Sequence, residues 1–154
     1  MTVQVTGVAE LKAKLRSLGA SMEDAIFGGV ILTANAVRTT AIKSIQNKSG
    51  GRQVQRSRQG GGTYTHTASD AGSAPNTDTG KLVASIAVES NRSGVYALVG
   101  SNLDYAGFLE FGTSSMGYRP WSRPWLEPAL RQNSDSLQFN INAAADALIA
   151  RKSK

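Results

Sequence analysis

The chain has 154 residues, a net charge of +6 and no cysteine. This length suits one domain with a substantial core, and the lack of cysteine excludes disulfides and cysteine-based metal sites or nucleophiles. No basic start followed by an apolar block marks a secretory signal, and the longest apolar stretch, 25–37, contains glycine and polar residues. Because a bilayer span needs ~20 apolar residues, we expect a soluble protein without membrane contact, folded in the reducing cytoplasm.

Two helices are expected at the N-terminal end. Apolar residues recur at helical spacing over 6–19, with Gly19 as a stop, and again over 21–50. The second helix contains a Gly28-Gly29 pair, which costs roughly 1 kcal/mol per glycine. The pair predicts either a kink or the close approach of another helix.

Residues 48–79 have a different composition, rich in Gly, Ser, Thr, Asn and Asp and poor in large aliphatic side chains. Such a segment buries too little apolar surface to offset its ordering entropy, so we expect a long mobile loop. Within it, "TYTHT" at 63–67 forms a strand only if another segment pairs with it. Between residues 48 and 69 the chain has four basic residues and no acidic one: Lys48, Arg52, Arg56 and Arg58.

Regular structure returns at residue 80. A helical turn at 80–86 leads into a strand, and "NRSG" followed by "VYALVG" predicts a β-hairpin. A helix at 105–111 follows, with Gly112 as its stop. Helical spacing places Tyr105, Phe108 and Leu109 on one face, which we expect to pack inward, and Glu110 on the opposite face together with Phe111.

Three prolines spaced four apart, Pro120, Pro124 and Pro128, come next. Each disfavours helical geometry at the preceding residue, so this segment is expected to be a stiff, extended arm. A final helix begins between 125 and 128. Its expected apolar stripe is Leu130, Leu137, Ile141, Ala144 and Leu148. The elements predict an α+β fold, with the N- and C-terminal helices packed on a small antiparallel sheet.

The sequence offers little for catalysis or metal binding. The one histidine, His66, lies in the 48–79 segment, and we find no group of convergent metal ligands and no nucleophile motif. The "GGG" at 60–62 lacks the lysine and hydroxyl residue of a phosphate-binding loop. We therefore expect neither an enzyme nor a cofactor.

The segment after the 105–111 helix contains the strongest candidates for an interface. Trp121 and Trp125 belong, with arginine, to the residue types enriched at binding hot spots, although both indoles could instead cover the protein's own core. A carboxylate–guanidinium pair between Glu110 and Arg119 or Arg123 would pin the arm to the helix. Within one chain this pair would be structural, and across two chains it would form an interface.

The motifs in this region resemble the HK97 gp10-like family of tailed-bacteriophage proteins. The resemblance rests on "YAGFLEFGT" at 105–113, on "RPWLEPAL" at 123–130 and on "TGKLVASI" at 79–86. It covers about residues 76–131, with Trp125 where phenylalanine is commoner. The resemblance implies a single domain over 1–154 and a structural, non-enzymatic protein of the neck or tail end of the virion.

Members of that family are similar to ring-forming proteins, commonly hexameric, at the head–tail junction through which DNA passes. The resemblance therefore implies a homo-oligomer made in the host cytoplasm, with head-completion, tail-tube or terminator proteins as partners. We expect the interface to include the residues of the helix and the arm: Tyr105, Phe108, Glu110, Phe111, Arg119, Trp121, Arg123 and Trp125. The alternative function is a small DNA-binding protein that uses the basic residues of 48–62.

Overall fold

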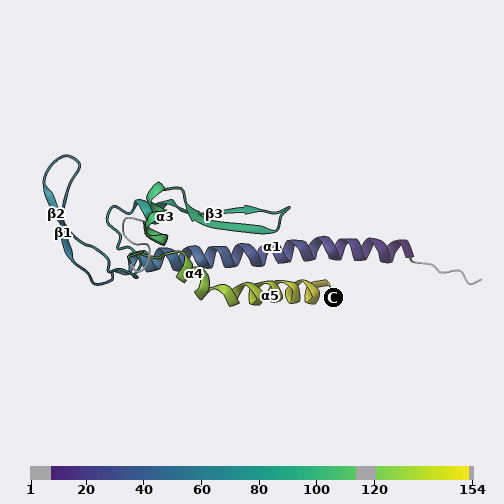
Figure 1. Ribbon diagram of the computed structural model, residues 1–154. Coiled ribbons are helices and arrows are strands. Elements are labelled where there is room, and N and C mark those ends of the chain that lie inside the picture. The colour runs from purple at the N-terminus through teal and green to yellow at the C-terminus, as the bar shows by residue number, and fades with distance from the viewer. Residues whose placement is uncertain (1–7, 114–120, 153–154) are drawn as a thin grey trace, which may run out of the picture.

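The computed structural model describes residues 8–113 and 121–152 (Figure 1). Among these residues, helices combine with two antiparallel two-stranded sheets, β1–β2 and β3–β4. This confirms the expected α+β fold with long N-terminal and C-terminal helices. The elements in chain order are α1 (Val8–Gln46), β1 (Gln53–Ser57), β2 (Thr63–Thr67), α2 (Lys81–Ser85), β3 (Ile86–Asn91), β4 (Tyr96–Ser101), α3 (Asp104–Phe111), α4 (Glu127–Gln132) and α5 (Ser134–Lys152).

The prediction of two N-terminal helices is wrong, because α1 is one continuous helix. Ser21, at the expected start of the second helix, donates its hydroxyl to the Ser17 carbonyl one turn earlier. Gly19 lies inside the helix, where an added Cβ would meet nothing within 4 Å. One glycine costs a helix about 1 kcal/mol, and the high helix propensity of the surrounding Leu, Ala, Lys and Arg residues offsets this cost.

The helix α1 forms the axis of the molecule, with the β3–β4 hairpin along one side and α5 along the other (Figure 1). The Arg38 side chain joins the hairpin to the helix by donating from Nε to the Ile86 carbonyl at 2.8 Å. On the other side, a Cβ added to Gly29 would lie 2.9 Å from the backbone nitrogen of Ile141. Gly29 therefore permits close approach of α5, which is one of the two outcomes predicted for the Gly28-Gly29 pair.

The core lies at the C-terminal end of α1. There α2, the start of β3, α3 and α4 all contribute buried apolar side chains, and the segment before α4 adds a tryptophan. Burial of such side chains is worth about 1.5–3 kcal/mol each. The cluster comprises Val37, Ala41, Ile45, Leu82, Ile86, Ala106, Trp125 and Ala129.

The 48–79 segment contains a β-hairpin, so the strand that was expected at 63–67 only with a partner does form. Strand β1 supplies the partner that "TYTHT" needs, with Gln53 opposite Thr67 and Ser57 opposite Thr63. The connecting turn contains three glycines at 60–62, all with positive φ, a conformation that costs glycine little. This β1–β2 hairpin projects past the C-terminal end of α1 (Figure 1).

The short connection through 80–101 matches its prediction closely. The helical turn α2 runs directly into β3, and β3 pairs with β4 across the expected turn, with Asn91 opposite Tyr96. The predicted final helix is interrupted at Asn133, since α4 ends at Gln132 and α5 starts at Ser134. Leu130 and Leu137 are consequently exposed, whereas Leu148 is buried as expected.

Helix α1 also alters the expectation about membranes. The stretch Lys12–Gln46 is long and apolar enough to cross a bilayer, with a mean hydropathy of 1.4 over 18 residues. The core helix of a soluble protein meets the same criterion, and the C-terminal half of α1 contributes Val37, Ala41 and Ile45 to the core. Length and hydropathy alone therefore do not place α1 in a membrane.

Candidate assembly surface

Glu110 is buried, contrary to the prediction that its face of α3 points away from the core, and only 5% of it is exposed. Its carboxylate accepts the backbone N–H groups of Trp125 and Leu126 on Oε2, at 2.8 and 2.9 Å, and that of Glu127 on Oε1, at 2.8 Å. These are donors that the first turn of α4 leaves without a helical partner. Glu110 thus caps α4 from a different helix, and its negative charge suits the helix dipole.

The expected pairing between Glu110 and Arg123 is wrong. The Arg123 guanidinium donates instead to Ser69, reaching its hydroxyl at 2.8 Å and its carbonyl oxygen at 3.2 and 3.3 Å. The Arg123 backbone N–H donates to the Leu109 carbonyl at 2.7 Å. The arm is therefore pinned to α3 within one chain, through its backbone. Arg119, the other expected partner, lies outside the described residues.

The two tryptophans of the arm have opposite environments. Trp125 is 3% exposed and packs in the core, with its indole N–H directed to the Ala106 carbonyl at 3.3 Å. Trp121 is 57% exposed. The sequence left open whether each indole covers the core or forms an interface. Trp125 packs in the core, whereas Trp121 is exposed and can contact a partner.

The outer face of α3 is aromatic. Phe108 is 61% exposed and Phe111 is 65% exposed, and Tyr105 is also exposed. The prediction that Tyr105 and Phe108 pack inward is therefore wrong, since the small Ala106 and the capping Glu110 occupy the inward face. Spaced three apart, the three rings follow one side of the helix, and they form a stripe that we call the aromatic face.

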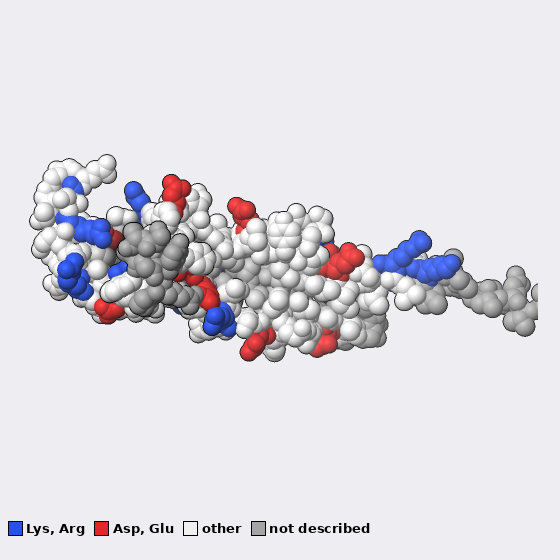
Figure 2. Space-filling model, viewed as in Figure 1, with Lys and Arg blue, Asp and Glu red and all other residues white. Residues whose placement is uncertain are grey.

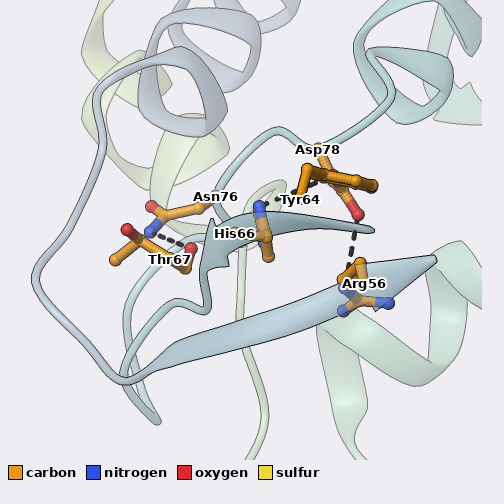
Figure 3. Close-up of polar contacts among 6 residues, drawn as sticks. All are labelled: Arg56, Tyr64, His66, Thr67, Asn76 and Asp78. Carbon is orange, nitrogen blue, oxygen red and sulfur yellow. Dashed lines mark hydrogen bonds and ion pairs between the residues drawn. The ribbon is translucent and has the colours of Figure 1, made fainter. Parts of the chain in front are cut away.

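The base of the β1–β2 hairpin is held by Asn76. Its Oδ1 accepts the backbone N–H of Ser49 at 2.8 Å, and its Nδ2 donates to the carbonyls of Ser49 and Thr67, both at 3.0 Å. One buried amide thus joins the chain entering the hairpin to the chain leaving it, and Figure 3 shows its bond to Thr67. Because buried polar groups are costly unless paired, this geometry restricts the hairpin at its root.

Asp78 holds the body of the hairpin in a similar way. Its Oδ1 accepts the Tyr64 hydroxyl at 2.6 Å, and its carboxylate lies 3.4 Å from Arg56 Nε and 3.6 Å from His66 Nδ1 (Figure 3). The hydrogen bond to Asp78 raises the pKa of the Tyr64 phenol above its ordinary value of 10.0. The single histidine of the chain therefore belongs to a structural cluster.

The four basic candidates, Lys48, Arg52, Arg56 and Arg58, are all exposed. Lys and Arg side chains gather over the hairpin in Figure 2. Arg56 shares the Asp78 carboxylate, and the Arg58 guanidinium lies 5.7 Å from the centre of the Tyr64 ring. The hairpin is therefore an ordered basic projection, and its charges can attract a phosphate backbone or an acidic protein surface.

An open hollow of about 520 Å³ separates the hairpin from the aromatic face. Arg56, His66 and Asp78 line it from the hairpin side, and Tyr105 and Leu109 line it from α3. Among the described residues, no group of three or more His, Asp or Glu could hold a metal ion. The basic hairpin and the aromatic face therefore lie on either side of one hollow, at the same end of the molecule.

Sequence reasoning missed Asn76, Asp78 and Ser69 as structural residues. Each lies in the polar 48–79 segment, where Asn, Asp and Ser are also the ordinary residues of turns. Their partners lie up to 54 residues away in sequence. No local pattern marks them as anchors.

Comparison with known proteins identifies a family. The family model described as "Bacteriophage HK97-gp10, putative tail-component" matches residues 9–112. No curated protein and no solved structure matches the chain. The match runs from α1 through the aromatic face and covers more than half of the sequence, so the chain belongs to the HK97-gp10-like family of bacteriophage tail components.

Proposed function

We propose that the protein is a tail-completion or neck protein that forms a ring at the head–tail junction of a long-tailed bacteriophage. The observation that carries this proposal is the aromatic face, formed by Tyr105, Phe108 and Phe111, together with the exposed Trp121. Large exposed aromatic side chains on one helix are unusual for a surface that meets only water. Aromatic residues and arginine are enriched among residues that dominate binding energy.

The setting of the aromatic face supports an assembly role. Its helix α3 is fixed to α4 and the arm by Glu110 and by the Arg123 backbone. A face held in this way loses little conformational freedom when a partner docks on it. If the partner is the next copy of the chain, a head-to-tail contact closes into a ring when its rotation divides the circle, for example a hexamer.

The proposal extends to the place of the ring and to its neighbours. A tail component is part of the virion, and the family resemblance favours the neck, with head-completion, tail-tube or terminator proteins as neighbours. We further propose that 1–154 is one domain, since α1 contributes to the shared core. The role is structural and requires neither a cofactor nor catalysis.

The experiment is measurement of assembly by native mass spectrometry and negative-stain microscopy, for the protein alone and with the tail-tube protein of the same phage. We expect a ring in at least one condition. A Phe108→Ser/Phe111→Ser variant should lose it, whereas Leu98→Ser, an exposed apolar residue on β4, should keep it. A protein that is monomeric in both conditions and absent from purified virions contradicts the proposal.

The basic hairpin favours a second candidate function, binding of DNA through Lys48, Arg52 and Arg58. Phosphate contacts give an affinity that falls steeply with salt. Binding to random duplex DNA should therefore weaken sharply between low and moderate salt. The Arg52→Ala/Arg58→Ala variant should show a smaller dependence of the binding constant on salt concentration. No binding at low salt rules this function out. The two functions are compatible, since a ring around DNA can direct its hairpins inward.

A further inference from the structure

The N-terminal part of α1 projects beyond the rest of the fold (Figure 1). The turn of the β3–β4 hairpin reaches α1 at Asp24, where Arg92 pairs with it. In residues 10–17, every side chain for which exposure is described is exposed, and Leu15 is 58% exposed. We call residues 8–20 the projecting segment of α1.

An isolated helix of this length is marginal in water, because few of its residues gain from packing. The projecting segment nevertheless has an apolar pattern, with Val8, Leu11, Leu15 and Leu18 at alternating steps of three and four. This spacing is the one with which a helix packs along another helix. Lys12 and Lys14 flank the apolar positions on either side, which gives the segment a basic border. Lys14 also lies 3.0 Å from Glu10, in an exposed ion pair that solvent screens.

The outer face of α5 has the complementary character. Five exposed residues follow it at steps of four and three: Asp135, Phe139, Asn142, Asp146 and Ile149. Phe139 is 71% exposed, the largest exposed fraction recorded among the exposed large hydrophobic residues. Acidic side chains lie along the α5 edge of the molecule, while basic ones cover the projecting end of α1 (Figure 2).

Leu15 cannot reach Phe139 within one chain. α5 packs on α1 with Ile141 against Gly29, and fourteen residues of helix separate Gly29 from Leu15, a distance of about 21 Å at 1.5 Å per residue. Phe139 and Leu15 therefore lie far apart in a single copy. Both faces are present on every copy, so the next molecule supplies what each one lacks.

We propose that the projecting segment of α1 docks on the outer face of α5 in the next copy of the chain. Leu15 and Leu18 pack on Phe139 and Ile149, and Lys12 and Lys14 face Asp135 and Asp146. The contact joins two different surfaces and so is head-to-tail, the kind that builds rings. The docking names one contact of the proposed ring, and in this respect it rests on the proposed function.

The test reverses the charges on one face and then on both. The quantity measured is the self-association constant of the chain, by sedimentation and native mass spectrometry. Lys12→Glu/Lys14→Glu should weaken self-association about tenfold or more, because like charges then face each other across the contact. Adding Asp135→Lys/Asp146→Lys to the same chain should restore it. The matched control, Lys43→Glu/Lys81→Glu, makes the same charge change at exposed positions outside both faces and should leave association intact.

Three results overturn this docking. The first is unchanged association of the Lys12→Glu/Lys14→Glu variant. The second is a loss that the α5 reversal does not rescue, which assigns the projecting segment to a different partner such as a tail protein. The third is a wild-type chain that stays monomeric at every concentration. If that chain is still found at the neck of purified virions, the docking fails while the proposed function stands.

Discussion

Replacement of Glu110 by glutamine tests how the arm is fastened. The substitution keeps the size of the side chain but removes its charge and puts an amide NH2 in place of one carboxylate oxygen. If the amide oxygen still accepts hydrogen bonds from the N–H groups of Trp125 and Leu126, the NH2 group faces the N–H of Glu127. In the wild-type protein the carboxylate accepts that N–H at 2.8 Å. Two charge-assisted bonds become neutral and one buried donor loses its acceptor.

The expected loss follows from these contacts. A bond to a charged group is worth roughly 1 kcal/mol more than a neutral one, and a stranded donor costs about 1–3 kcal/mol. The free energy of unfolding should therefore fall by about 3–5 kcal/mol, which lowers the melting temperature by roughly 6–20 °C for a chain of this size.

The assay is thermal and urea unfolding followed by circular dichroism, with hydrogen exchange of the amides at 125–127. The control is Glu89→Gln, which neutralises an exposed carboxylate on β3 and should change the stability by less than about 0.5 kcal/mol. A Glu110→Gln protein as stable as this control, with unchanged exchange at 125–127, would refute the assignment of Glu110 as the cap of α4.

Other predictions concern α1 and the hairpin. Gly28→Ala, where an added Cβ meets nothing within 4 Å, should stabilise the fold by up to about 1 kcal/mol, whereas Gly29→Ala should destabilise it by about 1–3 kcal/mol by pushing on Ile141; equal effects in urea unfolding would contradict the close packing of α5. Asn76→Ala should cost about 1–3 kcal/mol and speed hydrogen exchange across 49–67, and unchanged exchange there would show that Asn76 does not hold the hairpin. Tyr64 should titrate above pH 10.0, and Asp78→Asn should lower that pKa. Because the folded state holds the phenolic proton more tightly, the stability from this contact is present below pH 10 and lost as pH rises through the raised value; a spectroscopic titration that Asp78→Asn leaves unchanged would contradict the contact.

The elements that sequence predicted well are those with strong local signals. The turn at "NRSG", the stop at Gly112 and the helical turn entering β3 each depend on neighbouring residues alone, and the structure has all three. The family motif around 105–113 was likewise readable from a short stretch. Local chemistry therefore accounted for most of the β3–α3 region.

The orientation of α3 could not be predicted in the same way. Periodicity separates Phe108 from Glu110, but it does not say which face is buried, and hydrophobicity favours the wrong one. The decision depends on the three backbone N–H groups of residues 125–127, which lie at the C-terminal end of the arm and about 15 residues from Glu110 in sequence. A buried carboxylate with three donors is stable, and it leaves the aromatic rings on the surface.

The β1–β2 hairpin was missed for a related reason. Its sequence is polar, and a two-stranded hairpin alone is marginal in water. It is held by Asn76 and Asp78, which follow it in the chain and bind both of its strands. Whether it is mobile in the free protein stays a prediction, and hydrogen exchange of residues 53–67 measures it.

The central claim is that this tail component forms a ring at the head–tail junction. The most direct measurement is cryo-electron microscopy of purified virions at a resolution that allows α1 and the β1–β2 hairpin to be fitted. We expect a closed ring of this chain at the neck, around the DNA channel, with the aromatic face of α3 in a contact between proteins. A map that places the chain elsewhere in the particle, or virions that lack it, would contradict the proposed function.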